Sequence, residues 1–154
     1  SPLSSSSAAS DVYKRQTLSG VNSPSKAESA KTRPEVAYRN EVSYEWERAQ
    51  HLRELRAGKV TREELCDADF LLRAAAEHHG VDMRKPCPVC GSDMRLTRWV
   101  YGDALKRRAG SARSAAEIAD MAAEGLEFTV HFVEVCPACR WNHLLRAATV
   151  YALG

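Results

Sequence analysis

Two short cysteine motifs, Cys87-Pro88-Val89-Cys90 and Cys136-Pro137-Ala138-Cys139, decide how this chain is expected to fold. In each motif two residues separate the thiols, which is the spacing that lets two sulfurs bind one metal ion. Two such motifs supply the four thiolates of a closed tetrahedral site. We therefore predict a structural Zn²⁺ bound by Cys87, Cys90, Cys136 and Cys139. Four protein ligands leave no position open for water or substrate, so the metal should stabilise the fold and perform no chemistry.

The same motifs are compatible with two other roles, a disulfide or redox pair and an iron site. A redox role is disfavoured because neither motif lies between a strand and a long helix, as in thioredoxin-like proteins. The 45 residues between Cys90 and Cys136 exceed the spacing of a compact zinc ribbon, and a short helix expected at 114–125 accounts for the extra length. Structural zinc is therefore the preferred interpretation.

Four further residues bear on this metal site. Gly91 follows the first motif and can adopt a left-handed conformation, whereas Arg140 stands at the equivalent position after the second motif and departs from that pattern. His143 lies four residues after Cys139 and could replace a thiolate as ligand, although a packed or surface histidine is favoured. Cys66 is expected to be a small buried residue on an apolar helix face.

Composition places the chain among intracellular globular proteins. It has 154 residues, 44% of them hydrophobic, and a formal net charge of +2. We find no apolar stretch of about 18 residues that could span a bilayer and no apolar secretion signal at the start of the chain. We therefore expect a cytoplasmic location, where paired cysteines are more often metal ligands than disulfides.

The first part of the chain is expected to be a disordered tail. Residues 1–36 are rich in Ser, Ala, Lys and Pro and show no apolar periodicity. Residues 11–16 look like translated sequencing-adaptor sequence, and residues 1–16 are interpreted as an artefact and excluded from functional reasoning.

Residues 37–80 are predicted to form a helical hairpin. The first helix carries an apolar stripe with helical spacing, and Gly58 is placed to end it. Thr61 and Glu64 form a capping box that starts a second helix, which Asp67 or Asp69 can interrupt and recap. The hairpin is expected to bury Trp46 and Phe70. The stripe of the first helix comprises Val42, Trp46, Ala49, Leu52 and Leu55.

Residues 81–154 are predicted to form a zinc-ribbon domain. Residues 95–101, 128–135 and the segment after Trp141 have the composition or alternation of strands. Ser114 and Glu117 form a second capping box, which predicts a helical insert at 114–125. The predicted fold class is α+β: an N-terminal helical hairpin packed on a C-terminal three-stranded zinc ribbon with a short helical insert.

The chain resembles a family of short actinobacterial proteins catalogued as a domain of unknown function. The resemblance covers about residues 40–154 and implies an intracellular actinobacterial protein with a four-cysteine zinc ribbon. It implies no particular activity. The segments that carry it are residues 65–68, 71–75, 87–90, 99–102, 110–113, 133–136 and 139–144.

Charge is unevenly distributed and suggests a binding surface. Residues 82–113 hold eight Lys or Arg against three Asp, while residues 114–135 hold five acidic residues and no Lys or Arg. Cations beside aromatic rings can contact phosphates and stack on bases. Candidate contacts with nucleic acid or a partner are Arg84, Lys85, Arg95, Arg98, Trp99, Lys106, Arg107, Arg108 and Arg113.

We therefore expect a non-enzymatic zinc-ribbon adaptor that contacts nucleic acid or the machinery of transcription or translation. The alternative is a protein–protein interaction module in which the zinc is purely structural. An enzyme is disfavoured because the chain carries no phosphate-binding loop, no dinucleotide fingerprint and no evident nucleophile–base pair. Neither a membrane nor a small-molecule substrate is expected as a partner.

Overall fold

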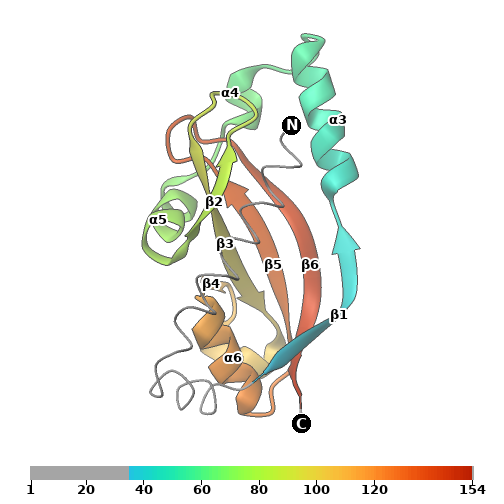
Figure 1. The fold of residues 1–154 in the computed structure, drawn as a ribbon, viewed down its shortest axis with the longest axis vertical. Helices are drawn as coiled ribbons and strands as arrows, with labels where there is room; N and C mark the ends of the chain where they lie inside the picture. The colour runs from blue at the N-terminus through green and yellow to red at the C-terminus, as the bar shows by residue number, and fades with distance from the viewer. Residues whose placement is uncertain (1–34, 154) are drawn as a thin grey trace, which may run out of the picture. The chain divides into compact units, whose positions relative to one another are not determined.

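A computed structural model describes residues 35–153, and within them one antiparallel sheet of six strands dominates (Figure 1). The strand order is β1-β6-β5-β3-β2, and the short β4 pairs with β3 beside this path. All of these pairings are antiparallel. The strands are β1 (Val36–Ser43), β2 (Val81–Pro86), β3 (Asp93–Tyr101), β4 (Ser111–Ala112), β5 (Phe128–Val135) and β6 (Asn142–Ala152).

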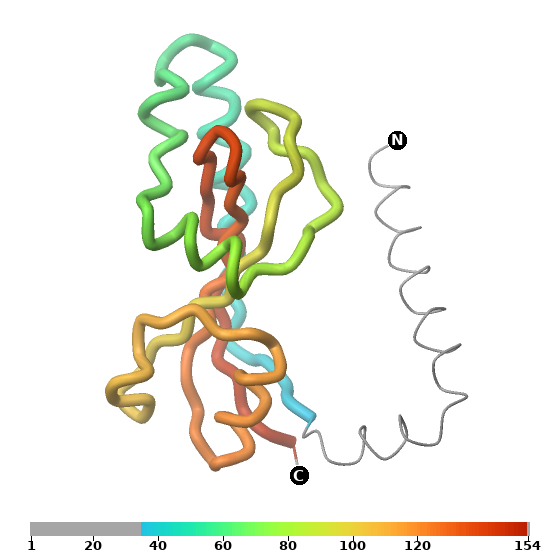
Figure 2. The backbone as a smooth tube through the Cα atoms, turned by 90° about the vertical axis from the view of Figure 1, so that its left-hand side faces the viewer, coloured from blue at the N-terminus to red at the C-terminus, as the bar shows by residue number. Residues whose placement is uncertain are grey.

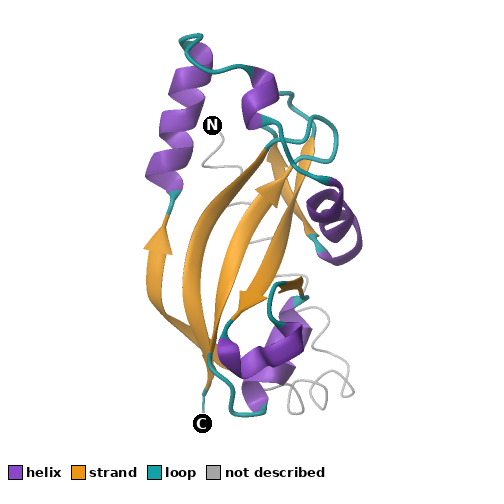
Figure 3. Cartoon of the chain, turned by 180° about the vertical axis from the view of Figure 1, so that it is seen from behind, coloured by secondary structure: helices purple, strands orange, loops and turns teal. Residues whose placement is uncertain are grey.

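The helices lie on the sheet or at its ends (Figure 3). Helix α3 packs against β6, α5 packs against β3 and β5, and α6 packs against β6. None of the helices in the described part of the chain is long and apolar enough to cross a lipid bilayer. The helices are α3 (Glu45–Arg56), α4 (Arg62–Leu65), α5 (Phe70–His79) and α6 (Ala115–Ala123), with a 3₁₀ helix, η1, at Asp103–Arg108.

The predicted fold class, an N-terminal helical hairpin on a three-stranded zinc ribbon, is wrong. Residues 36–43 form β1, an outer strand of the same sheet that carries the cysteine motifs. Val42 belongs to this strand and pairs with Ala147 of β6, so it cannot open a helical stripe. Periodicity could not separate the two states here, because a short strand followed at once by a helix shows apolar residues at mixed spacing.

The expected burial of Trp46 and Phe70 is also wrong. Their exposed fractions are 72% and 77%, and Leu52 is the buried residue of α3. Each helix instead finds its apolar partner on the sheet. The sheet is wider than the predicted ribbon. It therefore offers each helix of the predicted hairpin a larger apolar surface than its partner helix would.

Several local expectations are confirmed. Thr61 and Ser114 each form the predicted capping box, with Glu64 and Glu117 respectively. Asp69 recaps the interrupted helix by accepting a hydrogen bond from the Leu72 N–H at 2.8 Å. Residues 128–135 form β5 as predicted, and the segment after Trp141 is the strand β6. Of the tail predicted at residues 1–36, residues 1–34 lie outside the described part of the chain, and Val36 begins β1.

Hydrophobic clusters occupy the two ends of the sheet. In the backbone view, the segment from α3 to α5 lies toward one end and the segment from η1 to α6 toward the other (Figure 2). At one end α6 and η1 cover Val100, Val130 and Phe132. At the other end Trp141, Met94 and Leu52 pack around two of the cysteines. The hairpin turn between β2 and β3 and the turn between β5 and β6 both lie at this second end, which is where the cysteine motifs meet.

Both outer strands of the path are irregular. In β1 the register shifts between Arg39 and Val42, where Asn40 has a φ of +56°. In β2 the register shifts between Asp82 and Pro86, where Arg84 has a φ of +56°. Such bulges interrupt the regular row of backbone donors and acceptors at a strand edge.

Candidate metal centre

The four predicted cysteine ligands meet in space. The sulfur atoms of Cys87, Cys90, Cys136 and Cys139 all lie within 4.8 Å of one another. The Cys87–Cys139 and Cys90–Cys136 sulfur pairs are 3.6 and 3.5 Å apart. A tetrahedral ion with Zn–S bonds of about 2.3 Å would hold its sulfurs about 3.8 Å apart, so the cluster fits such an ion with small adjustments.

The first motif forms a tight turn around its leading sulfur. The backbone N–H groups of Val89 and Cys90 point at the sulfur of Cys87, with N···S distances of 3.3 and 3.5 Å. The Gly91 N–H donates to the Cys87 carbonyl at 3.0 Å, and Gly91 has a φ of +82°. The N–H dipoles stabilise negative charge on the sulfur, which suits a metal-bound thiolate.

The second motif repeats this turn with a different residue. The Cys139 N–H points at the Cys136 sulfur at 3.4 Å, and the Arg140 N–H donates to the Cys136 carbonyl at 2.9 Å. Arg140 has a φ of +77°, the left-handed conformation that Gly91 adopts in the first motif. For a residue other than glycine this costs roughly 1–3 kcal/mol, so neighbouring contacts must hold it in place.

Ala68 makes those contacts. The Arg140 Nε–H donates to the Ala68 carbonyl at 2.9 Å, and the Ala68 N–H donates to the Arg140 carbonyl at 3.0 Å. Ala68 is 2% exposed and lies in the link between α4 and α5. This reciprocal pair fixes the link against the second cysteine motif.

The same link brings a fifth thiol to the cluster. The Cys66 sulfur lies 3.7 Å from that of Cys139, but it is outside the set of four mutually close sulfurs. Cys66 is therefore placed to contact one ligand of the metal. A cavity of about 500 Å³, lined by Cys66, Cys90 and Cys139 among others, opens this side of the cluster. The sequence predicted a buried thiol on an apolar helix face, whereas Cys66 is half-buried and follows the last residue of α4. Nothing in the sequence indicated its contact with Cys139.

Burial and hydrogen bonding act in opposite directions on the thiols. Burial raises the pKa of Cys87 and Cys136, and it raises the pKa of Cys139 to about 12. Hydrogen bonds with Ser92 lower the pKa of Cys90 to about 6. A cation among the sulfurs would favour the thiolate form of all four, because its charge offsets the cost of burying theirs.

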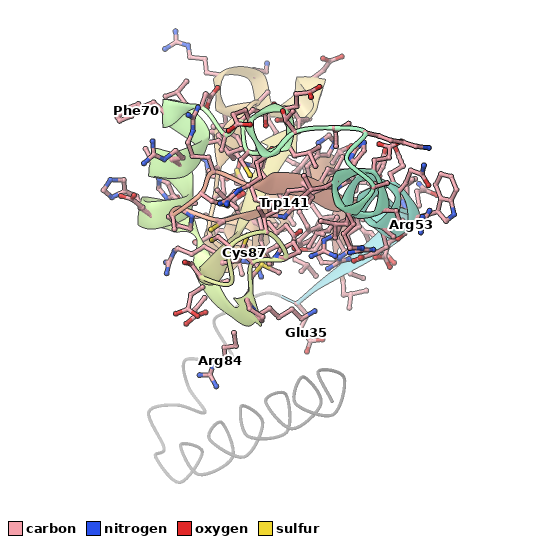
Figure 4. The ribbon with its side chains drawn as sticks, turned by 90° about the horizontal axis from the view of Figure 1, so that it is seen from above. Glu35, Arg53, Phe70, Arg84, Cys87 and Trp141 are labelled. Atoms are coloured by element: carbon pink, nitrogen blue, oxygen red, sulfur yellow. The ribbon has the colours of Figure 1, made fainter. Side chains whose placement is uncertain are left out.

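Trp141 packs against the cysteine cluster on its apolar side and lies close to Cys87 (Figure 4). Its indole N–H donates to Glu134 at 2.8 Å, and Glu134 also accepts from the Arg48 Nε–H at 2.5 Å. Glu134 is 2% exposed, and both donors reach the same oxygen, Oε2, of its buried carboxylate. The Arg48 contact ties α3 to β5, and nothing in the spacing of residues along the sequence indicated it.

His143 does not belong to the cysteine cluster. Its ring stacks against Trp141, with centroids 5.9 Å apart, and its Nε2 lies 3.1 Å from Nδ1 of His51. The set of mutually close ligand atoms contains only the four cysteines.

The predicted basic contacts are spread over several surfaces. Arg95 donates to the carbonyls of Ala76 and Gly80 at the end of α5. Arg98 and Trp99 are successive residues of β3 and face opposite sides of the sheet, with Arg98 5.9 Å from the Phe132 ring centre. The others lie on β2 (Arg84 and Lys85), in η1 (Lys106, Arg107 and Arg108) and after β4 (Arg113).

The fold and the cysteine site together define a small antiparallel β protein with four clustered thiols that could hold a metal ion. A family of unknown function, DUF5318, matches residues 36–154, and the chain belongs to that family. Uncharacterised proteins of Mycobacterium tuberculosis and Mycobacterium bovis are each 40% identical to it over 114 residues, which is 73% of this chain and 81% of the relative. These relatives agree with the expected actinobacterial origin. No solved structure matches the chain.

Proposed function

We propose that this protein is a zinc-stabilised, non-enzymatic interaction module that binds another protein through one face of its sheet. Zinc is the metal that four thiolates at this spacing favour. Because the thiolates would fill every position of a tetrahedral ion, the metal would support the fold rather than a reaction. Binding would then fall to a surface away from the cysteines.

The observation that carries the proposal is an apolar surface beside α5. We call Phe70, Leu71, Trp99 and Tyr101 the α5 face. Phe70, Leu71 and Tyr101 are 77%, 71% and 39% exposed, and Phe70 projects away from the body of the protein (Figure 4). Two adjacent cavities of about 550 and 440 Å³ share Leu71 and Trp99 in their walls. Grouped exposed apolar residues mark interaction sites, and aromatic residues are enriched in protein interfaces.

The charges around the α5 face favour a protein partner over nucleic acid. In the larger cavity the Arg113 and Glu117 side chains pair with each other at 3.4 Å, so this cation is already matched. Arg98 lies on the opposite face of the sheet from Trp99 and cannot join it in one phosphate-and-base site. A segment that presents apolar side chains fits this surface better than a polyanion.

Site-specific photo-cross-linking in an actinobacterial host tests the proposal. A photoreactive amino acid at Leu71 should give a discrete adduct with another protein, and the double substitution Phe70→Ser with Tyr101→Ser should remove that adduct. The matched control places the same group at Trp46, which is 72% exposed on α3 and should give no such adduct. The Leu71 adduct should survive nuclease treatment of the cells' extract.

Two results would contradict the proposal. Equal adducts at Leu71 and Trp46 would show that exposure alone controls the reaction. Loss of the Leu71 adduct after nuclease would favour the nucleic-acid adaptor, and charge reversal at Lys106, Arg107 and Arg108 would then be the next test.

A further inference from the structure

We propose that His51 and His143 form a second metal site, selective for divalent transition metals, with Glu47 as its third ligand. The two histidines come from α3 and β6 and lie 92 residues apart in the sequence. In the fold, Nδ1 of His51 and Nε2 of His143 are 3.1 Å apart. This site is distinct from the four cysteines and does not depend on the proposed α5 face.

Hydrogen bonding orients His143 as a metal ligand. Its Nδ1 lies 2.7 Å from the carbonyl oxygen of Leu144, so this nitrogen carries the hydrogen and donates it. The lone pair of Nε2 then faces His51. Histidine ligands of metal ions commonly donate their other ring N–H to a backbone carbonyl in this way, which fixes the tautomer and the ring orientation.

The distance between the two nitrogens suits a shared ion. Two unprotonated ring nitrogens at 3.1 Å would repel, so either a proton or a cation must lie between or beside them. Metal–nitrogen bonds of about 2.0–2.1 Å in a tetrahedral site place two nitrogens about 3.3 Å apart. A small shift of α3 would widen the distance between the two nitrogens enough for both to bind one ion.

A carboxylate is available one helical turn from His51. Glu47 lies four residues earlier on α3, so the two side chains share one face of the helix. Glu47, His51 and His143 line the same cavity of about 500 Å³, but their ligand atoms do not all lie within 4.8 Å of one another. The Glu47 side chain would therefore have to rotate toward the two histidines to bind the ion.

Two other acidic residues line this cavity, and one oxygen of each carboxylate is engaged. Glu64 accepts from Thr61 in the capping box, and Asp67 accepts from the Asn142 side chain at 2.9 Å. Within residues 35–153 the Glu47 carboxylate has no hydrogen-bond or ion-pair partner. The three carboxylates make the cavity electronegative, which favours a cation. Glu47 is preferred as the ligand because it shares a helix face with His51 and has neither oxygen engaged within the described residues.

The donor set indicates the class of metal. Two imidazoles and one carboxylate suit Zn²⁺, Co²⁺, Ni²⁺ and Cu²⁺ rather than Mg²⁺ or Ca²⁺. Three protein ligands would leave one position of a tetrahedral ion open to the cavity, unlike the closed cysteine site.

Cobalt titration of the zinc-loaded full chain, under reducing conditions, tests the site. The chain is loaded with one equivalent of zinc, which the four thiolates bind first and which leaves the histidine site empty. Added Co²⁺ should then bind one further equivalent and give visible ligand-field bands without thiolate-to-cobalt charge-transfer bands. His51→Ala and His143→Ala should each abolish these bands, and Glu47→Gln should weaken cobalt binding. The matched control, His78→Ala on the exposed side of α5, should bind cobalt like the unmodified chain. Circular dichroism checks that each variant is folded.

Unchanged cobalt binding by His51→Ala would overturn the proposal, as would the absence of a second bound equivalent in the unmodified chain. Charge-transfer bands would overturn it too, because they would show that cobalt had entered the cysteine site. His143 lies within the sheet, and if its variant fails to fold, His51→Ala on α3 decides the question alone.

Discussion

Arg140 and Ala68 are joined by two reciprocal hydrogen bonds, and this pair keeps Arg140 in a left-handed conformation beside the four-cysteine cluster. Replacing Arg140 with alanine removes the side-chain bond to the Ala68 carbonyl and leaves the backbone strain. We expect Arg140→Ala to lower the free energy of unfolding of the zinc-loaded protein by about 1.5 kcal/mol. Denaturant unfolding monitored by tryptophan fluorescence measures this.

Comparing Arg140→Gly with Arg140→Ala separates the effect of backbone strain on stability from the effect of the lost hydrogen bond. Glycine loses the same side-chain bond but adopts a φ of +77° without strain. This variant should therefore be more stable than Arg140→Ala by about 1 kcal/mol. An alanine variant as stable as the glycine variant would show that the left-handed conformation stores no strain.

The buried ion pair between Arg48 and Glu134 should be a strong link between α3 and the sheet. Arg48→Met leaves the Glu134 carboxylate, which is 2% exposed, without its cation. We expect a loss of about 3 kcal/mol in unfolding free energy, measured by denaturant unfolding. The double variant with Glu134→Gln should recover part of the loss, because the residues are coupled.

A surface pair provides the control for that measurement. Arg108 and Glu124 pair at 3.2 Å with exposed fractions of 35% and 51%. Arg108→Met should cost much less than Arg48→Met, since water screens exposed pairs. Equal costs for the two arginine variants would show that burial does not strengthen the Arg48 contact.

Cys66 should support the metal without binding it. Cys66→Ala should retain one zinc ion per chain, with affinity lowered about tenfold through loss of a neighbour to the Cys139 sulfur. Cys139→Ala removes a ligand and should lose the zinc during gel filtration with a chelator. Elemental analysis of the eluted protein distinguishes the two, and loss of zinc from both variants would make Cys66 a ligand.

Metal removal should loosen one end of the sheet first. The turns that carry the cysteines pack with Trp141, whereas the cluster under α6 lies at the other end. Chelation should therefore speed amide hydrogen exchange by orders of magnitude around Cys87 and Cys136, since structural zinc contributes about 10–16 kcal/mol in small domains. Mass spectrometry after exchange measures this region by region.

Amides of α6 and of the neighbouring half of β5 serve as the internal reference. They should keep most of their protection after chelation. Uniform loss of protection along the sheet would mean that the two ends unfold together.

The meeting of the four cysteines and several local elements could be predicted from the sequence, because their signals are local. A two-residue spacing brings thiols together, and Thr61 and Ser114 cap helices through residues three positions away. The sheet could not be predicted in the same way. Pairing of β1 with β6 joins Val36 to Ala152, and the sequence carries no local signal for that pairing. The Arg48–Glu134 and His51–His143 contacts share this property.

The irregular outer strands have a consequence for how this protein meets other chains. Regular strand edges template the addition of further strands, which is the route to aggregation and fibril growth. Here a bulge near Asn40 interrupts one outer strand, and a bulge near Arg84, followed by Lys85 and Pro86, interrupts the other. Self-assembly along these edges is therefore disfavoured, and the concentrated protein should resist amyloid formation.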